Sequence, residues 1–290
     1  MMQARKEVRT VGLIAKPNVE ASERWIPKIV HWLRARKIGI RMDSVTAAYM
    51  GEDGGLAPAA VPDGCDLIVS LGGDGTLLSA TRAVNGRDIL IFPVNLGRLG
   101  FLSAIPADAV MGELERVVRG EYRESCRRLL YCELMRGETV VVAYDALNDV
   151  VVTNSSLARM VEFDLRVDES HMCGYKADGV IISTPTGSTA YSLSAGGPII
   201  YPTVDCFCLT PICPHILTNR PVVVPDSSIL ELTLNSSNDS VWLTIDGQVG
   251  QTLEPGDRVV CRRSERTVRL VAPPNMHFFD VLRDKLKWGA

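Results

Sequence analysis

Strand and helix patterns alternate through the N-terminal part of the chain, and this alternation constrains the fold more than any other feature. Apolar, partly β-branched runs at residues 8–15, 66–71 and 89–94 predict buried strands. Apolar residues at helical spacing predict helices over residues 22–37 and 106–119. Strands that alternate with helices usually form a parallel sheet covered on both faces. We therefore expect an α/β domain in this part of the chain.

From about residue 122 the pattern changes to many short β-rich runs. Turn signals such as Asp246-Gly247 separate many of these runs, which is typical of a mostly antiparallel sandwich. The pattern becomes helical again near the C-terminus, over residues 275–287. The expected domains are an α/β domain with a parallel sheet at residues 1–125, a β-sandwich domain at residues 126–272, and a C-terminal helix at residues 273–290 that packs back on the N-terminal domain.

The composition is that of a soluble globular protein. Of 290 residues, 46% are hydrophobic and 22% are charged, which leaves enough apolar material for a sizeable core. Lys and Arg number 31 against 34 Asp and Glu, so the net charge of −3 gives no reason to expect nucleic-acid binding. No apolar run approaches the roughly 20 residues that a membrane span requires, and the polar N-terminus lacks a signal-peptide pattern. We therefore expect a cytoplasmic protein that binds neither nucleic acid nor membrane.

The chain contains 8 cysteines and 4 histidines. The cysteines show no C-x-x-C spacing and the histidines no H-E-x-x-H motif, so neither residue type indicates a metal site. A chain of this length needs no disulfide framework, and we expect free thiols.

The segment Gly72-Gly73-Asp74-Gly75-Thr76 carries the strongest chemical signal in the α/β part. It lies between the predicted strand at residues 66–71 and a short predicted helix at residues 76–84. Ligands of open parallel sheets bind beyond the carboxyl ends of the strands, and a helix N-terminus favours an anion. A carboxylate in such a phosphate cradle should repel the phosphate. Its presence is explained if Asp74 binds a divalent cation or accepts a proton from an attacking hydroxyl. The alternative is a tight turn whose aspartate caps the helix.

Residues 178–198 form a second segment, rich in glycine, serine and threonine. The pattern predicts a strand, a turn and a short helix of small residues. Its hydroxyl groups and a helix N-terminus can hydrogen-bond ribose and phosphate, and Tyr191 can lie against a base or a sugar. The alternative is a Ser/Thr-rich loop that packs closely because its residues are small. A third element, Asn148-Asp149, would by itself indicate only a turn.

Taken together, these segments resemble the NAD kinase family over residues 8–287. The G-G-D-G-T turn alone is shared with diacylglycerol and sphingosine kinases, whereas the segment at 178–198 is far more specific to NAD kinases. The order and spacing of further segments agree with the family, namely residues 93–102, 210–215, 220–221 and 246–248.

The resemblance implies both an activity and an architecture. Members of the family transfer the γ-phosphoryl group of ATP, or in some cases a phosphoryl group of polyphosphate, to the 2′-hydroxyl of the adenosine ribose of NAD. The product is NADP, and the site lies between an α/β domain and a β domain. The resemblance thus implies an enzyme that uses NAD and ATP as substrates with a divalent cation, expected to be Mg²⁺. It also implies a homodimer or homotetramer.

The resemblance further implies roles for individual residues. Asp74 matches the family's catalytic aspartate, the general base toward the 2′-hydroxyl. Asp149 stands where the family has Glu, so its side chain is one methylene shorter. The residues expected at the ATP phosphates are Gly72, Gly73, Gly75 and Thr76. The residues expected to contact NAD are Asp74, Gly75, Asn148, Asp149, Arg159, Lys176, Asp178, Thr189, Ala190, Tyr191, Ser192, Leu193, Ser194 and Gln248.

Two other functions are compatible with parts of the pattern. A lipid or sphingoid kinase could share the G-G-D-G-T turn, but it would need an apolar lipid slot and usually a membrane-facing patch, and we find no basic amphipathic helix of that kind. A non-catalytic dinucleotide-binding or sensor protein could share the fold without the activity. The presence of Asp74 argues against this second alternative, because a protein without catalysis has no need of the base.

Overall fold

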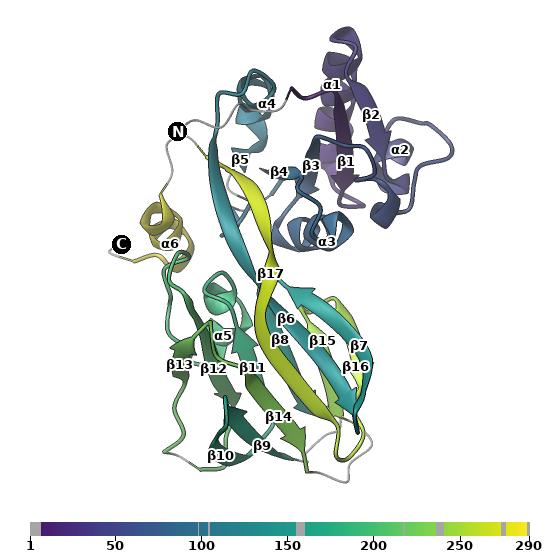
Figure 1. Ribbon diagram of the computed structural model, residues 1–290. Coiled ribbons are helices and arrows are strands. Elements are labelled where there is room, and N and C mark those ends of the chain that lie inside the picture. The colour runs from purple at the N-terminus through teal and green to yellow at the C-terminus, as the bar shows by residue number, and fades with distance from the viewer. Residues whose placement is uncertain are drawn as a thin grey trace. The chain divides into compact units, whose positions relative to one another are not determined.

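Two units make up the structure, a computed structural model of the chain (Figure 1). The structure describes residues 7–97, 99–103, 105–154, 160–216, 218–235, 241–273 and 277–288. The first unit contains Met1–Cys126 and Val268–Ala290, and the second contains Arg127–Thr267. Each unit has a hydrophobic core of its own.

The first unit is built on a parallel sheet. Its strands lie in the order β4-β3-β1-β2, and each neighbouring pair is parallel. β4 also pairs in parallel with β5 and with the last part of β17. Every residue of β3 and β4 is buried, as a sheet covered on both faces requires. The strands are β1 (Thr10–Ala15), β2 (Gly39–Met42), β3 (Leu67–Gly72), β4 (Leu90–Asn95) and β5 (Ile105–Pro106).

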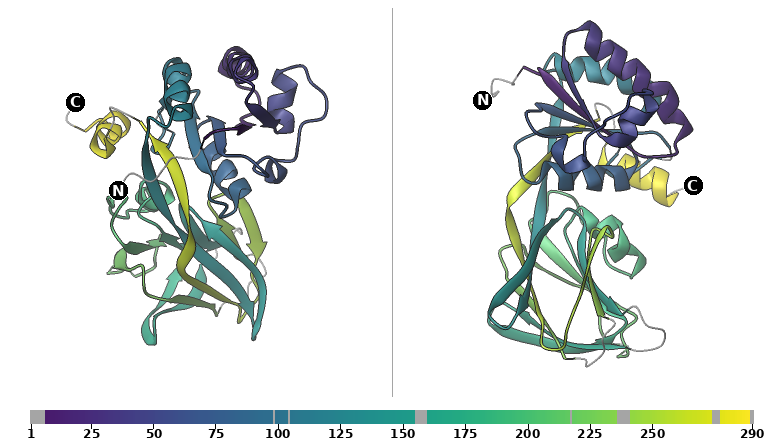
Figure 2. Two further views of the ribbon diagram at one scale, coloured as in Figure 1. Left: turned by 45° about the horizontal axis from the view of Figure 1, so that its top comes forward. Right: turned by 90° about the vertical axis from the view of Figure 1, so that its right-hand side faces the viewer.

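Helices cover this sheet (Figure 2). Those of the first unit are α1 (Glu20–Ala35), α2 (Ser44–Tyr49), α3 (Asp74–Val84), α4 (Val110–Val118) and α6 (Phe278–Leu286). Apolar side chains of α1 and α4 share one core with alternate strand residues such as Leu13, Val69 and Phe92. α3 follows β3 through the glycine turn and packs back against it. The turn therefore sits where a buried strand passes directly into a packed helix.

The sequence patterns miss two elements of this unit, β2 and α2. They contain only 4 and 6 residues, too few to show a clear period. The helix predicted at residues 106–119 begins only at Val110. The segment before it pairs with β4 through Ile105–Pro106 and then forms a 3₁₀ turn at Ala107–Ala109.

Two sheets face each other in the second unit (Figure 2). One has the strand order β10-β9-β14-β17-β6-β7, and the other has the order β13-β12-β11-β8-β15-β16. Phe163 of the first sheet and Phe207 of the second belong to one shared core. The strands are β6 (Arg123–Arg136), β7 (Thr139–Ala146), β8 (Asp149–Asn154), β9 (Val161–Val167), β10 (Ser170–Ala177), β11 (Gly179–Ser183), β12 (Cys206–Ile212), β13 (Val222–Pro225), β14 (Leu230–Leu234), β15 (Val241–Ile245), β16 (Val249–Thr252) and β17 (Arg258–Ala272).

The predicted fold class is confirmed. The chain combines a parallel-sheet α/β unit with a β-sandwich unit whose paired strands are antiparallel, and it ends in the helix α6. All eight cysteines are free thiols, as expected. Within the described ranges, no helix combines the length and the apolar character needed to cross a membrane.

The second sheet of the sandwich has a core face and an opposite face. On β8, Val150 and Val152 belong to the shared core, so Asp149 and Val151 lie on the opposite face. β11 pairs with β8 in a register that sets Ser183 beside Asp149. The segment after β11 includes the short helix α5 (Tyr191–Ser194), and Ala195 directly after it packs on Val151.

Candidate active site

The order of the strands in the first unit marks a position for a ligand. The chain passes from β1 to β2 on one side and then places β3 on the other side of β1. The strand order therefore reverses between β1 and β3, and ligands of open α/β sheets bind beyond the carboxyl ends of the strands at such a point. The segments that follow these two strands begin at Lys16 and at Gly73.

The glycines of the turn differ in what the fold requires of them. A Cβ on Gly72 would overlap the side chain of Thr76, so packing explains this glycine. Gly73 and Gly75 have no neighbouring atom within 4 Å of a built Cβ, and neither has a positive φ. Neither packing nor backbone conformation therefore requires glycine at these two positions, and the absence of side chains leaves the backbone open to close approach by a ligand.

The Asp74 carboxylate is held by the backbone of a second loop. Phe101 N donates to Oδ2 at 2.8 Å, while Leu102 N and Ser103 N donate to Oδ1 at 3.2 and 2.8 Å. The Ser103 hydroxyl adds a bond to Oδ1 at 2.7 Å. A Cβ on Gly100 would overlap this carboxylate, so only glycine lets the loop pass so close.

These contacts decide between the two readings of Asp74. The N-cap of α3 is Gly73, and Asp74 directs its side chain to residues 101–103 rather than to its own helix. The helix-capping interpretation is therefore wrong. A carboxylate oxygen offers two lone pairs. Among the described residues Oδ2 accepts one hydrogen bond, from Phe101 N, so it retains the capacity to accept a proton or another hydrogen bond.

A buried amide supports this arrangement from behind. Asn95 ends β4 and donates from Nδ2 to both the carbonyl and the hydroxyl oxygen of Ser103, each at 3.0 Å. Its Oδ1 accepts a hydrogen bond from Gly97 N at 2.8 Å. Asn95 and Ser103 are both almost completely buried. A continuous chain of hydrogen bonds thus runs from Asn95 through Ser103 to the Asp74 carboxylate and holds it in place.

In the second unit, Asp246 anchors the Asn148-Asp149 element. Its carboxylate accepts hydrogen bonds from the backbone N–H groups of Leu147, Asn148 and Asp149 at 3.0, 2.7 and 3.2 Å. Asp246 and Gly247 have positive φ values and form the two-residue turn between β15 and β16. The hairpin turn therefore also positions the start of β8.

Asp149, at the start of β8, is a buried carboxyl group. The residue is 4% exposed, and no described group donates a hydrogen bond to its carboxylate. Burial raises the pKa of Asp149 from 3.8 to about 7, and the nearby Asp246 carboxylate adds to the increase. On the adjacent strand, the buried Ser183 hydroxyl also has no hydrogen-bond partner among the described residues. Two unsatisfied polar groups side by side are costly unless a ligand pairs with them.

The turn after β11 packs directly on the Asn148-Asp149 element. Thr184 donates from Oγ1 to the Leu147 carbonyl at 2.6 Å and from its backbone N to the Asn148 carbonyl at 2.9 Å. A Cβ on Gly187 would overlap the same Asn148 carbonyl. The structure therefore brings together two segments that lie far apart in the sequence.

The predicted residues after this turn differ in accessibility. Tyr191 is 45% exposed, and Ser194 is also exposed. Ser192, by contrast, is buried, and its hydroxyl shares a hydrogen bond with Thr210 at 2.9 Å. Its hydroxyl therefore holds the segment in place rather than facing solvent. Thr189, Ala190 and Leu193 are partly buried.

The remaining predicted residues lie elsewhere. Lys176 is exposed and pairs with Glu162 at 2.7 Å, and Asp178 precedes the first residue of β11. The far end of β11, Ser183, is the one beside Asp149, so about 17 Å separates Asp178 from Asp149 at roughly 3.4 Å per strand residue. One copy of the chain thus does not bring Lys176 and Asp178 to Asp149. Gln248 is exposed directly after the Asp246-Gly247 turn, and Arg159 lies outside the described residues.

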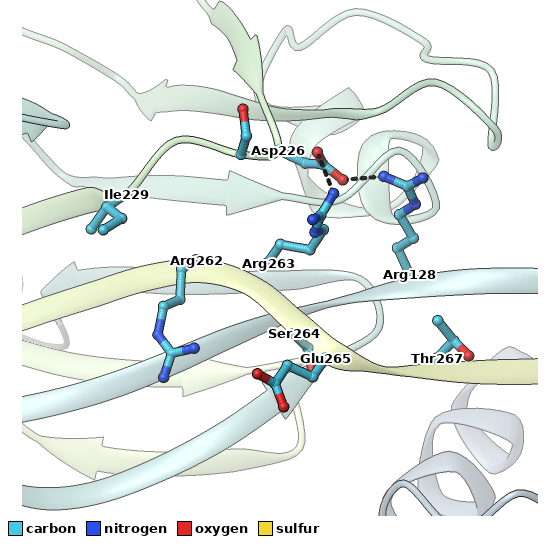
Figure 3. Close-up of a pocket in the computed structure, with 9 residues that line it drawn as sticks. Arg128, Asp226, Ile229, Arg262, Arg263, Ser264, Glu265 and Thr267 are labelled. Carbon is cyan, nitrogen blue, oxygen red and sulfur yellow. Dashed lines mark hydrogen bonds and ion pairs between the residues drawn. The ribbon is translucent and has the colours of Figure 1, made fainter.

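A cavity of about 580 Å³ in the second unit contains several arginines (Figure 3). Arg128 and Arg263 both pair with the buried Asp226. Arg262 points away from this pair and lies over the Tyr131 ring at 4.4 Å. Arg128 also pairs with Asp205, so two carboxylates oppose the two guanidinium groups, and the cluster ties strands together rather than offering an anion site.

The described residues contain no group of three or more His, Cys, Asp or Glu that could hold a metal ion. The Asp74 carboxylate is already engaged by three residues of the 101–103 loop. A metal ion at this site would therefore depend on oxygen atoms that a substrate brings with it, as Mg²⁺ commonly does with phosphates.

Fold and site together define a class of protein. An open glycine turn at the reversal point of a parallel sheet suits phosphate, and the oriented carboxylate beside it suits proton transfer from a hydroxyl. These are the features of a phosphotransferase that works without a P-loop lysine.

Comparison with known proteins identifies the family. Residues 11–122 match the ATP-NAD kinase N-terminal domain, and residues 147–272 match the ATP-NAD kinase C-terminal domain. The NAD kinase of Solibacter usitatus (strain Ellin6076) is 55% identical over 97% of this chain and 98% of its own length. The NAD kinase of Koribacter versatilis (strain Ellin345) is 44% identical over 97% and 99%. The chain belongs to the NAD kinase family and is a kinase, so the resemblance noted in the sequence is confirmed.

Solved structures agree with this assignment. A yeast NADH kinase complexed with NADH superposes with a TM-score of 0.92 at 25% identity, covering 99% of this chain and 89% of that one. An NAD kinase from Archaeoglobus fulgidus in complex with ATP has a TM-score of 0.76 at 24% identity, covering 95% and 99%, and supports the fold. The match to both NAD kinase domains leaves the lipid-kinase alternative without support.

Sequence reasoning missed several residues that build the site. Ser103 and Asn95 were not singled out, although both follow or end a strand near the glycine turn. The sequence marks Asp246 as a turn residue and as part of the family segment at residues 246–248. Its bonds to residues 147–149 cross a long stretch of sequence, so no local pattern predicts them. Lys16 precedes Pro17 at the end of β1, and this position at the carboxyl edge of the sheet was the available signal.

Proposed function

We propose that this chain transfers the γ-phosphoryl group of ATP to the 2′-hydroxyl of the adenosine ribose of NAD, forming NADP, with Asp74 as the general base. The observation that carries the proposal is the Asp74 carboxylate, fixed by residues 101–103 with Oδ2 still able to accept a proton. The relatives named NAD kinase support the substrate, and the ATP complex of the Archaeoglobus fulgidus enzyme supports the donor.

The proposed reaction has a simple balance. The 2′-hydroxyl oxygen attacks the γ-phosphorus, and its proton passes to Oδ2 of Asp74. The bond from the γ-phosphorus to the bridging oxygen breaks, and ADP leaves. ATP enters as its Mg²⁺ complex, in which the ion neutralises phosphate charge. The backbone of Gly72, Gly73, Gly75 and Thr76 is proposed to hold the phosphates, since Gly73 and Gly75 leave the turn open.

NAD is proposed to contact the second unit around Asn148 and Asp149. A carboxyl group whose pKa is about 7 is partly protonated at neutral pH and can then donate a hydrogen bond to a ligand oxygen or nitrogen. The unpartnered Ser183 hydroxyl next to it supports a polar ligand at this point. The other proposed NAD contacts are Asp74, Gly75, Thr189, Ala190, Tyr191, Leu193, Ser194 and Gln248. Ser192, whose buried hydroxyl bonds Thr210, and Arg159 are retained from the sequence.

Lys176 and Asp178 require a different explanation. Within one copy they lie at the end of β11 away from Asp149, so we propose that they reach NAD from a second copy in a homodimer or homotetramer. The cytoplasmic location and the absence of nucleic-acid and membrane partners remain predictions from the sequence.

The test measures NADP formation from NAD, ATP and Mg²⁺, with glucose-6-phosphate dehydrogenase as a readout specific for NADP. Loss of a general base typically costs about 10²–10⁴-fold, so Asp74→Asn should bind NAD but lose turnover by that factor. Asp53→Asn changes an exposed aspartate outside the site and serves as the matched control. Near-full kcat in Asp74→Asn would refute the base assignment. Tight NAD binding by the unmodified protein without any product would instead favour a dinucleotide sensor.

A further inference from the structure

The C-terminal helix α6 reaches the loop that holds Asp74. Lys285, in the last turn of α6, places its ammonium group over the ring of Phe101, 5.7 Å from the ring centroid. An ammonium group within about 6 Å of an aromatic ring is attracted by the negative face of the ring. Both residues belong to the first unit, so the contact lies inside one compact part of the chain.

Phe101 can transmit this contact to the Asp74 carboxylate. Its backbone N donates to Oδ2 of Asp74 at 2.8 Å, and Oδ2 is the oxygen that accepts the proton in the proposed reaction. The ring and the backbone N belong to the same residue, so a displacement of the ring also displaces the donor. Lys285 is therefore separated by a single residue from the hydrogen bond that directs Oδ2.

The two oxygens of Asp74 differ in how their donors are supported. Oδ1 accepts from the backbone N and the hydroxyl of Ser103, and the buried Asn95 amide holds Ser103 from behind. Oδ2 accepts from Phe101, which is only partly buried. A loop residue with few buried contacts opens more easily than one in a packed core. The contact with Lys285 thus stabilises the less supported end of the loop.

The helix α6 is itself well fixed. Val281 and Leu282 are only 5% and 1% exposed, so one face of the helix is packed. Lys285 lies four and three residues further on and therefore leaves the helix on the same face. At the start of the helix, His277 N donates to Asp280 Oδ2 at 2.8 Å as part of a capping box. Because packing and capping do not involve the ammonium group, α6 should stay folded without it.

We propose that Lys285 is a positioning residue: it holds the Phe101 ring, and the backbone N of Phe101 in turn directs Oδ2 of Asp74 toward the attacking hydroxyl. The C-terminal helix thereby contributes to the reaction rate as well as to the fold. This inference rests on the proposed function, since Lys285 acts through the proposed general base.

Steady-state kinetics provides the first test. Lys285→Gln removes the charge but keeps a good helix-forming residue. An exposed contact between an ammonium group and a ring corresponds to a factor of about two to five. We therefore expect kcat to fall by about that factor, while the KM values for NAD and ATP and the melting temperature stay close to their original values.

Two further variants serve as controls for this measurement. Lys285→Arg keeps a cation that can stack on the ring and should recover the rate. Lys28→Gln removes an exposed lysine that makes the same kind of contact elsewhere, 4.8 Å from the centroid of the Trp25 ring on α1, and should leave kcat unchanged. An unchanged kcat in Lys285→Gln, or a loss that Lys285→Arg does not recover, would overturn the inference.

A double-mutant cycle tests whether the ring transmits the effect. Phe101→Leu removes the ring and keeps the backbone N, and we expect kcat to fall at least as far as in Lys285→Gln. Adding Lys285→Gln to Phe101→Leu should then cause no further loss, because the partner of the ammonium group is already gone. If Lys285→Gln lowers kcat by the same factor with and without the ring, Lys285 does not act through Phe101 and the inference fails.

Hydrogen exchange measures the same contact without turnover. We expect the backbone amides of residues 101–103 to exchange about two to five times faster in Lys285→Gln than in the unmodified protein, Lys285→Arg or Lys28→Gln. Equal exchange in all four proteins would overturn the inference and leave the proposed function intact. If the unmodified protein forms no NADP from NAD, ATP and Mg²⁺, the proposed function fails, whereas faster exchange in Lys285→Gln would still support the hold of Lys285 on the loop.

Discussion

Asp74 and Asp149 are both aspartates, but their carboxyl groups differ in burial and in the hydrogen bonds that they accept. Asp74, in the first unit, accepts four hydrogen bonds from residues 101–103 and is partly exposed. Asp149, in the second unit, is buried, receives none from the described residues and lies near Asp246. The first environment fixes the direction of a carboxylate, and the second raises a pKa. Two roles therefore follow from surroundings rather than from residue type.

The difference also shows how each environment is built. Asp74 depends on a loop that comes close because Gly100 has no side chain. Asp149 depends on the Asp246 hairpin, which holds the backbone of residues 147–149 and at the same time adds a like charge. Variants of the loop around Asp74 therefore test the orientation of its carboxylate, and variants of Asp149 test the protonation of a buried carboxyl group.

The largest effect is expected from Gly100→Ala. The added methyl group would overlap the Asp74 carboxylate and the Ser103 hydroxyl and must displace one of them. A misplacement of about 1 Å at a reacting group can cost about 10²-fold, so we expect kcat to fall by about that factor with little change in the KM for NAD. Gly112→Ala adds a methyl group in open space on α4 and should leave both constants unchanged. Steady-state kinetics measures kcat and the KM for NAD of both variants. Equal kcat values would show that catalysis does not depend on the position of the Asp74 carboxylate.

A pH-dependent change in stability is expected from Asp149→Asn. Because the pKa of Asp149 rises from 3.8 to about 7 on folding, the folded protein binds more protons than the unfolded chain between those values. The free energy of unfolding must therefore fall as pH rises through this window. The cost is absent below pH 4 and complete above pH 7. Replacing the carboxyl group with an amide removes it, and we expect a gain of about 2 kcal/mol at pH 8.

Chemical denaturation at several pH values measures this effect without any ligand. The difference between Asp149→Asn and the unmodified protein should shrink steadily toward pH 4. Asp53→Asn, at an exposed site, should show no such trend. A difference that is constant across the pH range would mean that Asp149 does not titrate in the folded protein as proposed.

A smaller effect is expected from removal of the Ser103 hydroxyl. Ser103→Ala deletes one hydrogen bond to Asp74 Oδ1 and one acceptor for Asn95, while the backbone donors of residues 101–103 remain. A hydrogen bond to a charged group contributes about 1.5–3 kcal/mol, so we expect kcat to fall about tenfold or somewhat more. Ser103→Thr retains the hydroxyl and should recover most of the rate. If both variants lose the same activity, the hydroxyl does not orient Asp74.

Much of the fold could be predicted because its signals are local. The strand at residues 66–71, the helix after it and the Asp246-Gly247 turn all appear in the structure within one or two residues of their expected limits. β2 and α2 escaped prediction because 4 and 6 residues carry almost no periodicity. Part of the candidate site escaped for another reason. Ser103 lies 29 residues from Asp74, and Asp246 lies 98 residues from Asn148, so no local pattern links either pair.

The sequence by itself determined the two-part architecture, the family and the glycine turn with its aspartate, because periodicity and short motifs are written along the chain. Tertiary structure alone decided what those residues can do. Strand order placed Lys16 beside the glycine turn, the 101–103 loop left Oδ2 of Asp74 open, and burial near Asp246 raised the pKa of Asp149. Hydrogen-bond direction and desolvation depend on which groups meet in space, and that is settled only when distant segments pack together.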